Sequence, residues 1–365
     1  MQLNLTSEQS LLRDSAAKFV AATGPKVARE HRGASPSFSP ARLRQAAELG
    51  WLGVLVPSAA NGLGLGLTEL ALVLEQTGRG LICEPVGLAA IAAAALARAP
   101  TPHPVLACVV SGAALVVPAL EERGFRDDPL APPLTRVTGS DGVLRLSGAK
   151  VFVCADGADG FIVSASAPDG PMLCYVARNA QGCEITPTPT VEGRALATLG
   201  LADTPAERIT ATQASSDAVD AFYNLSLFAL SAELLGVMEK AYEITLDYLR
   251  IRKQFGKPIG SFQALQHQAV NAYVHIEATR SLLYQIAANN DPQHIDPAMA
   301  AALKAKASED ALIVTKACIQ LHGGIGFTDE HEIGLYLKRA MLLSSLCGNA
   351  AAQRRRYAAI TKLSA

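Results

Sequence analysis

Arg252-Lys-Gln-Phe-Gly-Lys-Pro-Ile-Gly-Ser-Phe-Gln263 is the most informative stretch of this sequence. The apolar spacing before it predicts a long helix from about Ala218 to Arg252, and a second helix is predicted after it, through about Asn289. Glycine and proline between the two helices favour a turn, and Ser261 is a candidate cap for the second helix. Taken alone, the stretch is explained equally well by a charged helix end followed by an ordinary turn.

A second stretch, Gln320-Leu-His-Gly-Gly-Ile-Gly-Phe-Thr328, ends the next predicted helix, Pro297–Leu321. Adjacent glycines terminate a helix, or they let the backbone approach a ligand closely. The central His322 is expected to serve the turn rather than catalysis. Two such stretches in one helical segment are difficult to explain as turns alone, and together they indicate a ligand-contacting surface.

The rest of the chain shows helices, then strands, then helices. Segregation of this kind predicts an α+β fold, with an N-terminal helical domain, a middle antiparallel β domain and a C-terminal helical domain. The expected boundaries are 1–110, 111–215 and 216–365. No GxGxxG follows a strand, which disfavours a Rossmann dinucleotide site. The elements expected outside the C-terminal segment are helices Ser7–Ala21 (with Thr6 and Gln9 as a capping box), Ala41–Gly50 and Leu67–Gly78, and strands Val143–Leu146, Val151–Cys154, Phe161–Ser164 and Met172–Val176.

Composition narrows the class of protein. The 365 residues are 50% hydrophobic, which favours a folded core. Their net charge of −1 excludes an overall positive potential that would attract nucleic acid. The longest apolar run, Val86–Ala97, is shorter than the roughly 20 residues of a membrane span. Seven cysteines without CxxC spacing predict reduced thiols in a cytoplasmic protein and no metal site. The run Arg354–Arg356 is expected to be a solvated helix face.

With these motifs in view, the sequence resembles the acyl-CoA dehydrogenase family over nearly its whole length. The two C-terminal stretches resemble the family's RxQFG and QxHGGxGF elements. Leu146-Ser-Gly-Ala-Lys150 resembles its β-domain signature, and Leu49-Gly-Trp-Leu-Gly-Val-Leu-Val-Pro57 resembles its first domain. The resemblance implies a four-helix C-terminal domain, bound FAD, an acyl-CoA substrate, an electron-transfer acceptor protein and a tetramer.

The resemblance also implies which residues contact the cofactor. Positions in the RxQFG and QxHGGxGF elements reach the FAD of a neighbouring subunit in the family. An arginine suits the pyrophosphate because its planar fork makes two charge-assisted bonds, and glycines let the backbone approach. The cofactor-binding residues expected here are Arg252, Gln254, Phe255, Gln263, Gln320, Gly323 and Gly324.

The residues that would face the chain's own flavin depart from the family pattern. Ala119-Leu-Glu-Glu-Arg-Gly-Phe-Arg126 stands where the family has a loop rich in hydroxyls and small glycines. The family has a triplet here that begins with an aromatic residue and ends with a hydroxyl residue. This chain has Phe152-Val153-Cys154, and cysteine is a poor substitute for a hydroxyl donor.

The catalytic base is unknown from the sequence. The two family positions for the glutamate hold Cys347 and Ser226, neither of which is a carboxylate. Glu233 is a weak candidate, because seven helical residues place it about 10 Å along the axis from Ser226. Cys347 is expected to be a packed thiol.

The leading expectation is FAD-dependent α,β-dehydrogenation of an acyl-CoA thioester by a subunit of a (hetero)tetramer. The departures resemble the branch of the family that acts on steroid or other ring-bearing acyl-CoA esters, in which a second acyl-CoA dehydrogenase-like chain is the partner. The alternative is a non-catalytic subunit that completes the FAD site of a catalytic partner. Two further alternatives are a homotetramer that uses Glu233 as base and an acyl-CoA oxidase or flavin monooxygenase on the same fold.

Overall fold

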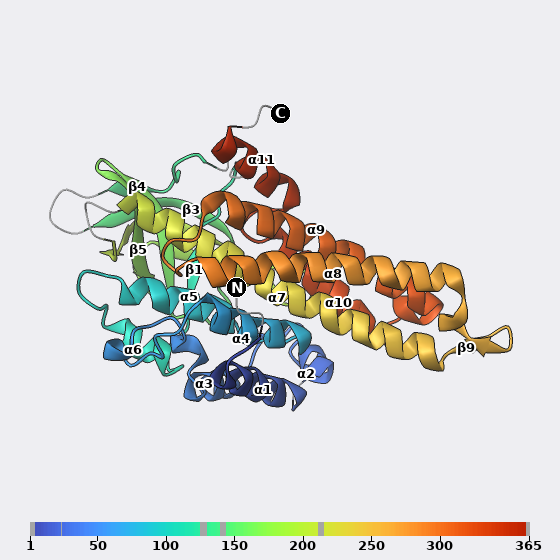
Figure 1. The fold of residues 1–365 in the computed structure, drawn as a ribbon. Helices are drawn as coiled ribbons and strands as arrows, with labels where there is room; N and C mark the ends of the chain where they lie inside the picture. Colours follow the sequence, from blue (N-terminus) through green and yellow to red (C-terminus); the bar gives the residue numbers. More distant parts are fainter. Residues whose placement is uncertain (1–3, 23, 125–129, 139–143, 211–214, 363–365) are drawn as a thin grey trace.

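The computed structural model describes residues 4–22, 24–124, 130–138, 144–210 and 215–362. Helices come first, a sheet follows, and a helical bundle ends the chain, which confirms the predicted fold class (Figure 1). The domain boundaries stay predictions. The helix α6 ends at Val110 and β1 begins at Val116, whereas β8 ends at Arg208 and α7 begins at Ser215.

The N-terminal region contains short helices and one strongly apolar helix, α5, which packs against α4, α6 and the 3₁₀ turn η1. Thr6 and Gln9 form the predicted reciprocal capping box at the start of α1, with N···O distances of 3.0 and 3.1 Å. The apolar run Val86–Ala97 is helix α5 and is buried along most of its length. The other elements of this region are α1 (Ser7–Ala21), α2 (Gly24–Glu30), α3 (Pro40–Glu48), α4 (Leu67–Arg79), α6 (Val105–Val110) and the 3₁₀ turns η1 (Trp51–Gly53) and η2 (Ser58–Ala60).

The sheet runs in the order β6-β7-β3-β2-β4-β5-β8, and β1 pairs with β4. Most pairs are antiparallel, while β1 and β2 pair with β4 in parallel. The strands are β1 (Val116–Ala119), β2 (Arg136–Thr138), β3 (Arg145–Val153), β4 (Gly160–Ala167), β5 (Gly170–Ala177), β6 (Cys183–Pro189), β7 (Ala195–Pro205) and β8 (Glu207–Arg208).

One strand prediction was wrong. The sequence predicts separate strands at Val143–Leu146 and Val151–Cys154, but β3 runs unbroken from Arg145 to Val153. Gly148 has a φ of 152°, and the register against β7 shifts on both sides of it. Bulges let one strand bend without ending, and period-two patterning does not record them. Val143 itself lies outside the described residues.

The C-terminal bundle is built on α7. This helix has the length and apolar composition of a membrane span, but 89% of its most apolar window is buried inside the protein, as expected of a core helix. The helix α8 begins after Phe262, so Ser261 does not cap it; the Ser261 hydroxyl donates to the Pro258 carbonyl instead. The elements are α7 (Ser215–Ile251), β9 (Lys253–Gln254), β10 (Lys257–Pro258), η4 (Ile259–Ser261), α8 (Gln263–Asn289), α9 (Pro297–His322), η5 (Gly323–Phe327), α10 (Ile333–Ser345) and α11 (Ala350–Thr361).

The run Arg354–Arg356 is not wholly solvated, contrary to the prediction. Arg354 and Arg355 are exposed, whereas Arg356 is buried and its guanidinium lies 4.7 Å from the centre of the Tyr223 ring. Packing of α11 against α9 decided this, with Arg356 reaching Tyr223 of α7, because the run spans less than one helical turn and its members point in different directions.

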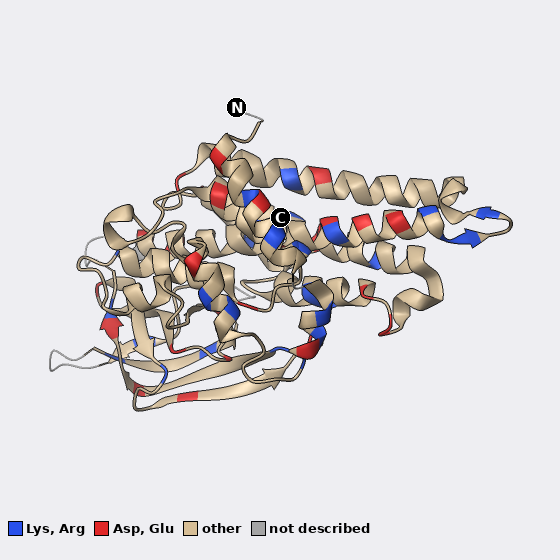
Figure 2. Ribbon diagram, turned by 90° about the horizontal axis from the view of Figure 1, so that it is seen from below, with Lys and Arg blue, Asp and Glu red and all other residues tan. Residues whose placement is uncertain are grey.

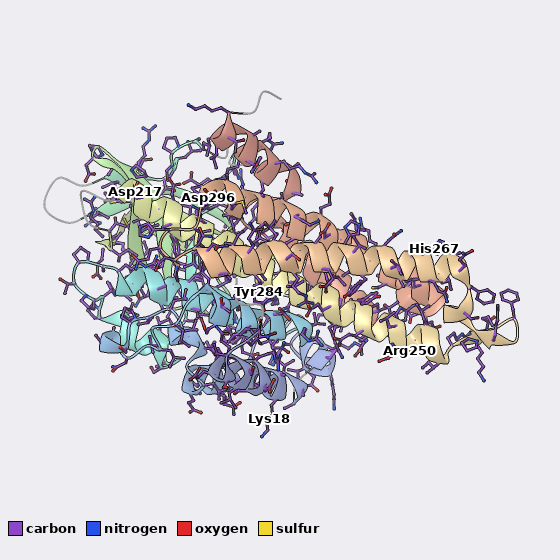
Figure 3. The ribbon with its side chains drawn as sticks, in the orientation of Figure 1. Lys18, Asp217, Arg250, His267, Tyr284 and Asp296 are labelled. Carbon is purple, nitrogen blue, oxygen red and sulfur yellow. The ribbon has the colours of Figure 1, made fainter. Side chains whose placement is uncertain are left out.

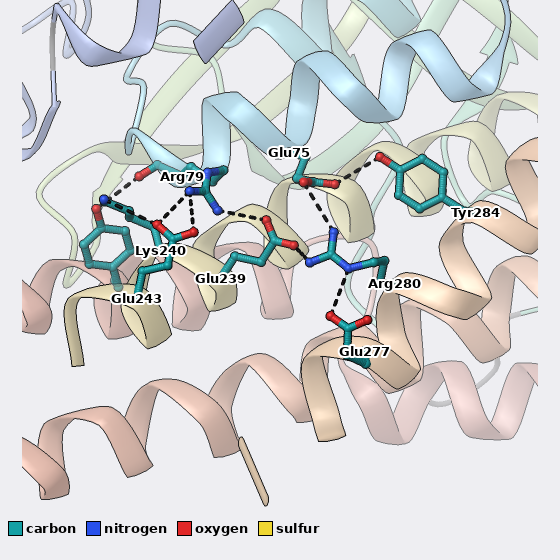
Figure 4. A network of polar contacts seen from close by, with 9 residues as sticks. Glu75, Arg79, Glu239, Lys240, Glu243, Glu277, Arg280 and Tyr284 are labelled. Carbon is teal, nitrogen blue, oxygen red and sulfur yellow. Dashed lines mark hydrogen bonds and ion pairs between the residues drawn. The ribbon is translucent and has the colours of Figure 1, made fainter. Parts of the chain in front are cut away.

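The helix α4 crosses α7 at two glycines, Gly78 and Gly236, where the backbones touch. Beside the crossing lies a charged network that joins the N-terminal region to the bundle (Figure 4). Its contacts are Arg79 to Glu239 at 3.1 Å, Arg79 to Glu243 at 2.6 Å, Arg280 to Glu75 at 3.5 Å, Arg280 to Glu239, and the Tyr284 hydroxyl to Glu75 at 3.1 Å. These contacts fix α4 relative to α7 and α8 of the bundle.

Candidate functional site

The structure brings the predicted cofactor-binding residues to one end of the bundle. Arg250 near the end of α7 and His267 near the start of α8 lie at this end, whereas Asp217 and Asp296 lie at the other (Figure 3). A small apolar cluster of Leu249, Ala269 and Leu321 ties together the ends of α7, α8 and α9. All seven predicted residues are exposed: Arg252, Gln254, Phe255, Gln263, Gln320, Gly323 and Gly324.

Open backbone is available at this end. A Cβ added at Gly323 or Gly324 would meet nothing within 4 Å, whereas one at Gly326 would lie 2.7 Å from the Ile319 carbonyl oxygen. Packing inside the chain therefore requires glycine at 326 but not at 324, and at 323 the φ of 67° favours it. A face left clear of side chains is what a closely approaching ligand needs.

The hairpin β9–β10 projects from this end and carries basic residues (Figures 1 and 2). Phe255 at its tip is 90% exposed. The Lys257 ammonium lies 4.5 Å from the centre of the Phe262 ring. Cations, exposed aromatic rings and open backbone suit a ligand with both a diphosphate and planar rings, so these residues fit the adenosine diphosphate half of FAD.

His322 is buried beneath this face, as its expected role in the turn requires. Its Nδ1 lies 2.7 Å from the Cys318 carbonyl oxygen, and its ring stacks on Tyr248 at 4.5 Å between ring centres. Burial lowers the pKa of His322 below its usual value, so the ring is neutral at physiological pH. The neutral ring supports η5 from within.

The positions that would form the chain's own flavin and substrate site also converge, far along the sequence from one another. Phe152, Cys154, Ser226 and Cys347 line a single cavity together with Glu121. The cavity has a volume of about 30 Å³, which is room for one or two water molecules. The three-ring flavin does not fit there, but Glu121 and Phe152 also line an adjoining open pocket of about 610 Å³. No step of a reaction is assigned to the small cavity.

The Glu121 carboxylate lies in the wall of this cavity. It is 5% exposed and accepts hydrogen bonds from the Cys347 amide at 2.5 Å and from the Gly348 amide at 3.3 Å. No sequence pattern singled out Glu121, because two adjacent acids after a strand usually face water. Its neighbour Glu122 is also buried and pairs with Lys150 at 2.6 Å.

The two family base positions supply no competent base to this cavity. The Ser226 hydroxyl donates to the Phe222 carbonyl one turn earlier, at 2.8 Å. Burial, and then the nearby Glu121, raise the pKa of the Cys347 thiol well above its usual value. Burial likewise raises the pKa of Cys154 to about 11. Both thiols are therefore protonated at neutral pH.

Glu233 lies in a neighbouring pocket and is engaged by Arg339 at 2.8 Å. Arg339 is fully buried and also pairs with Glu192. The Glu233 carboxylate is therefore engaged in an ion pair with a guanidinium that packing holds in place. The role of Glu233 as base stays a prediction, and this geometry favours a structural role.

Comparisons with known proteins agree with this architecture. Residues 219–361 match the family described as Acyl-CoA dehydrogenase, C-terminal domain, and residues 6–103 match Acyl-CoA dehydrogenase, N-terminal domain. Acyl-CoA dehydrogenase IpdE2 of Mycobacterium tuberculosis is 29% identical over 336 residues, which cover 91% of each chain.

Two solved structures are similar throughout. A variant of the Tcur3481–Tcur3483 steroid ACAD matches with a TM-score of 0.90 and 32% identity, covering 97% of this chain and 98% of that one. The ChsE4–ChsE5 complex from Mycobacterium tuberculosis matches with a TM-score of 0.88 and 27% identity over 100% of both chains. Fold, motifs and relatives agree with one another: this chain belongs to the acyl-CoA dehydrogenase family.

Proposed function

We propose that this chain is the subunit of an acyl-CoA dehydrogenase heterotetramer that completes the FAD site of a catalytic partner. The observation that carries the proposal is the contrast between two places in one chain. The exposed bundle end presents Arg252 and open backbone for the cofactor's diphosphate half, whereas the two family positions for the base hold Ser226 and Cys347, which are not carboxylates.

In this assembly the residues of this chain bind the cofactor and orient it. Arg252 neutralises the diphosphate, and the open backbone at Gly323 and Gly324 lets the cofactor lie close. FAD, when bound, supplies the hydride acceptor for α,β-dehydrogenation. The partner supplies the flavin loop and the glutamate that removes the α-proton, since neither Ser226 nor Cys347 serves as a base.

The names of the relatives support a substrate class and an assembly. The two solved structures described above are a steroid acyl-CoA dehydrogenase and a two-chain complex. We therefore assign a ring-bearing acyl-CoA ester as substrate and a second acyl-CoA dehydrogenase-like chain as partner. An electron-transfer protein as acceptor and a cytoplasmic location belong to the same proposal.

The test is co-expression with any adjacent acyl-CoA dehydrogenase-like gene, followed by flavin stoichiometry and a panel of linear, branched and steroid-side-chain acyl-CoA esters. The expected complex holds one FAD for each pair of chains and turns over a ring-bearing ester, while the isolated chain holds none. Flavin binding and turnover by the isolated chain, abolished by Glu233→Gln, would overturn the proposal in favour of the homotetramer.

Arg252 can be tested with a matched control. Arg252→Ala in the complex removes a charge-assisted contact worth roughly 1.5–3 kcal/mol, so FAD affinity falls about tenfold or more. Arg250→Ala removes the same charge two residues earlier, where Arg250 pairs with Asp247 on the exposed helix surface at 2.8 Å. Flavin retention should change only in Arg252→Ala. Equal effects of the two variants would mean that Arg252 contributes through the net charge of the protein alone and makes no specific contact with the cofactor.

A further inference from the structure

The turn between α10 and α11 presents two consecutive backbone amides to the sheet. Cys347 has a φ of 53° and Gly348 a φ of 81°, so the backbone of both residues is in the left-handed conformation. Successive N–H groups at such a turn form an anion-binding concavity. Glu121 enters it from the residue pair that follows β1, and its two oxygens take one amide each.

The remaining polar atoms of this turn are also engaged. The Cys347 carbonyl accepts from the Tyr223 hydroxyl at 2.8 Å and from the Gln353 side-chain amide at 2.5 Å. The Gly348 carbonyl accepts from the buried Lys304 ammonium at 3.4 Å. The carbonyls are thus held from the helix side, while the amides depend on Glu121 coming from the sheet side.

We propose that the Cys347 and Gly348 amides form an oxyanion-binding site whose resident ligand is the chain's own Glu121. The carboxylate thereby joins the sheet to the turn between two helices. When Glu121 is removed, the vacated site binds a small free carboxylate. This inference does not depend on the heterotetramer, because it concerns the stability of the isolated full-length chain.

The experiment is thermal unfolding of Glu121→Ala with and without sodium formate, using sodium chloride at equal ionic strength as the salt control. Loss of two charge-assisted hydrogen bonds should lower the Tm by about 5 °C. Formate at millimolar concentration should restore part of that loss in the variant and leave the wild-type Tm unchanged, since the wild-type site is filled.

Tyr223→Phe is the matched control, because it removes a hydrogen bond from the same turn without vacating an amide. It should lower the Tm without a response to formate. Failure of formate to raise the Tm of Glu121→Ala, or an equal rise in Tyr223→Phe, overturns the inference.

A second variant keeps the test decisive if Glu121→Ala does not fold. Glu121→Gln keeps the shape of the side chain, but turns an NH₂ group toward one amide. It should fold with a lowered Tm and no formate response, because the site remains occupied. A Tm equal to that of the wild type would show that the charge of Glu121 is irrelevant and would overturn the inference.

Discussion

Gly236→Ala should separate α4 from α7, because no room exists for one additional carbon atom. The new Cβ would lie 2.7 Å from the Glu75 carbonyl carbon and 2.9 Å from the Arg79 amide nitrogen, and closer still to the Glu75 carbonyl oxygen. Ordinary contacts begin at about 3.4 Å. The obstacle is backbone on α4, so the whole helix must retreat by roughly 1 Å or more, against interiors packed almost as densely as crystals.

Two opposing effects decide the size of the change. Alanine is better than glycine in a helix by about 1 kcal/mol. Overpacking a rigid core typically costs about 1–3 kcal/mol and occasionally more, and the retreat of α4 also lengthens its contacts in the charged network. At this site the steric cost should exceed the gain in helix propensity, so the free energy of unfolding should fall by about 2 kcal/mol.

Chemical denaturation monitored by circular dichroism measures this change, and Gly334→Ala in α10 is the control. There the nearest atom to an added Cβ is the Gly326 carbonyl oxygen at 3.9 Å, so the same substitution should be neutral or slightly stabilising. A Gly236→Ala protein as stable as the wild type, or equal losses at both positions, would refute the close-crossing argument.

Three further outcomes are expected. Glu239→Gln should lower the free energy of unfolding by about 3 kcal/mol, because it leaves the partly buried guanidinium groups of Arg79 and Arg280 without their shared carboxylate. Lys240→Ala, which removes a surface ion pair, should lower it by less than about 0.5 kcal/mol. Equal losses in denaturant titration would contradict this. Burial lowers the pKa of Lys150 from 10.5 to about 8, so between these values the unfolded chain binds more protons and stability gains a contribution that rises with pH. The stability of the wild type relative to Lys150→Met should therefore increase as the pH rises from about 8 to about 10 in urea titrations, and a constant or falling difference would count against it. Exposed Cys108 should react first with a thiol reagent in the folded chain, while Cys347 stays unmodified; mass spectrometry of peptides reads this out, and early labelling of Cys347 would contradict its raised pKa.

Much of the fold could be predicted from local pattern. The capping box at Thr6, the apolar period of α7 and the glycine end of α9 are properties of a few neighbouring residues, and the structure contains each of them. The unbroken strand β3 was missed because the bulge at Gly148 depends on pairing with β7, distant in sequence. The buried position of Arg356 was missed for the same reason, since it depends on how α11 docks.

The candidate site divides in the same way. By itself the sequence determined which motifs the chain carries, the family they indicate, and the absence of a carboxylate at positions 226 and 347, because these are matters of residue identity. Only the tertiary structure decided that Glu121 accepts the Cys347 amide and that Arg339 engages Glu233. Such pairs join residues that are more than 100 positions apart, and a buried charge is stable only where folding delivers its partner, which no local pattern encodes.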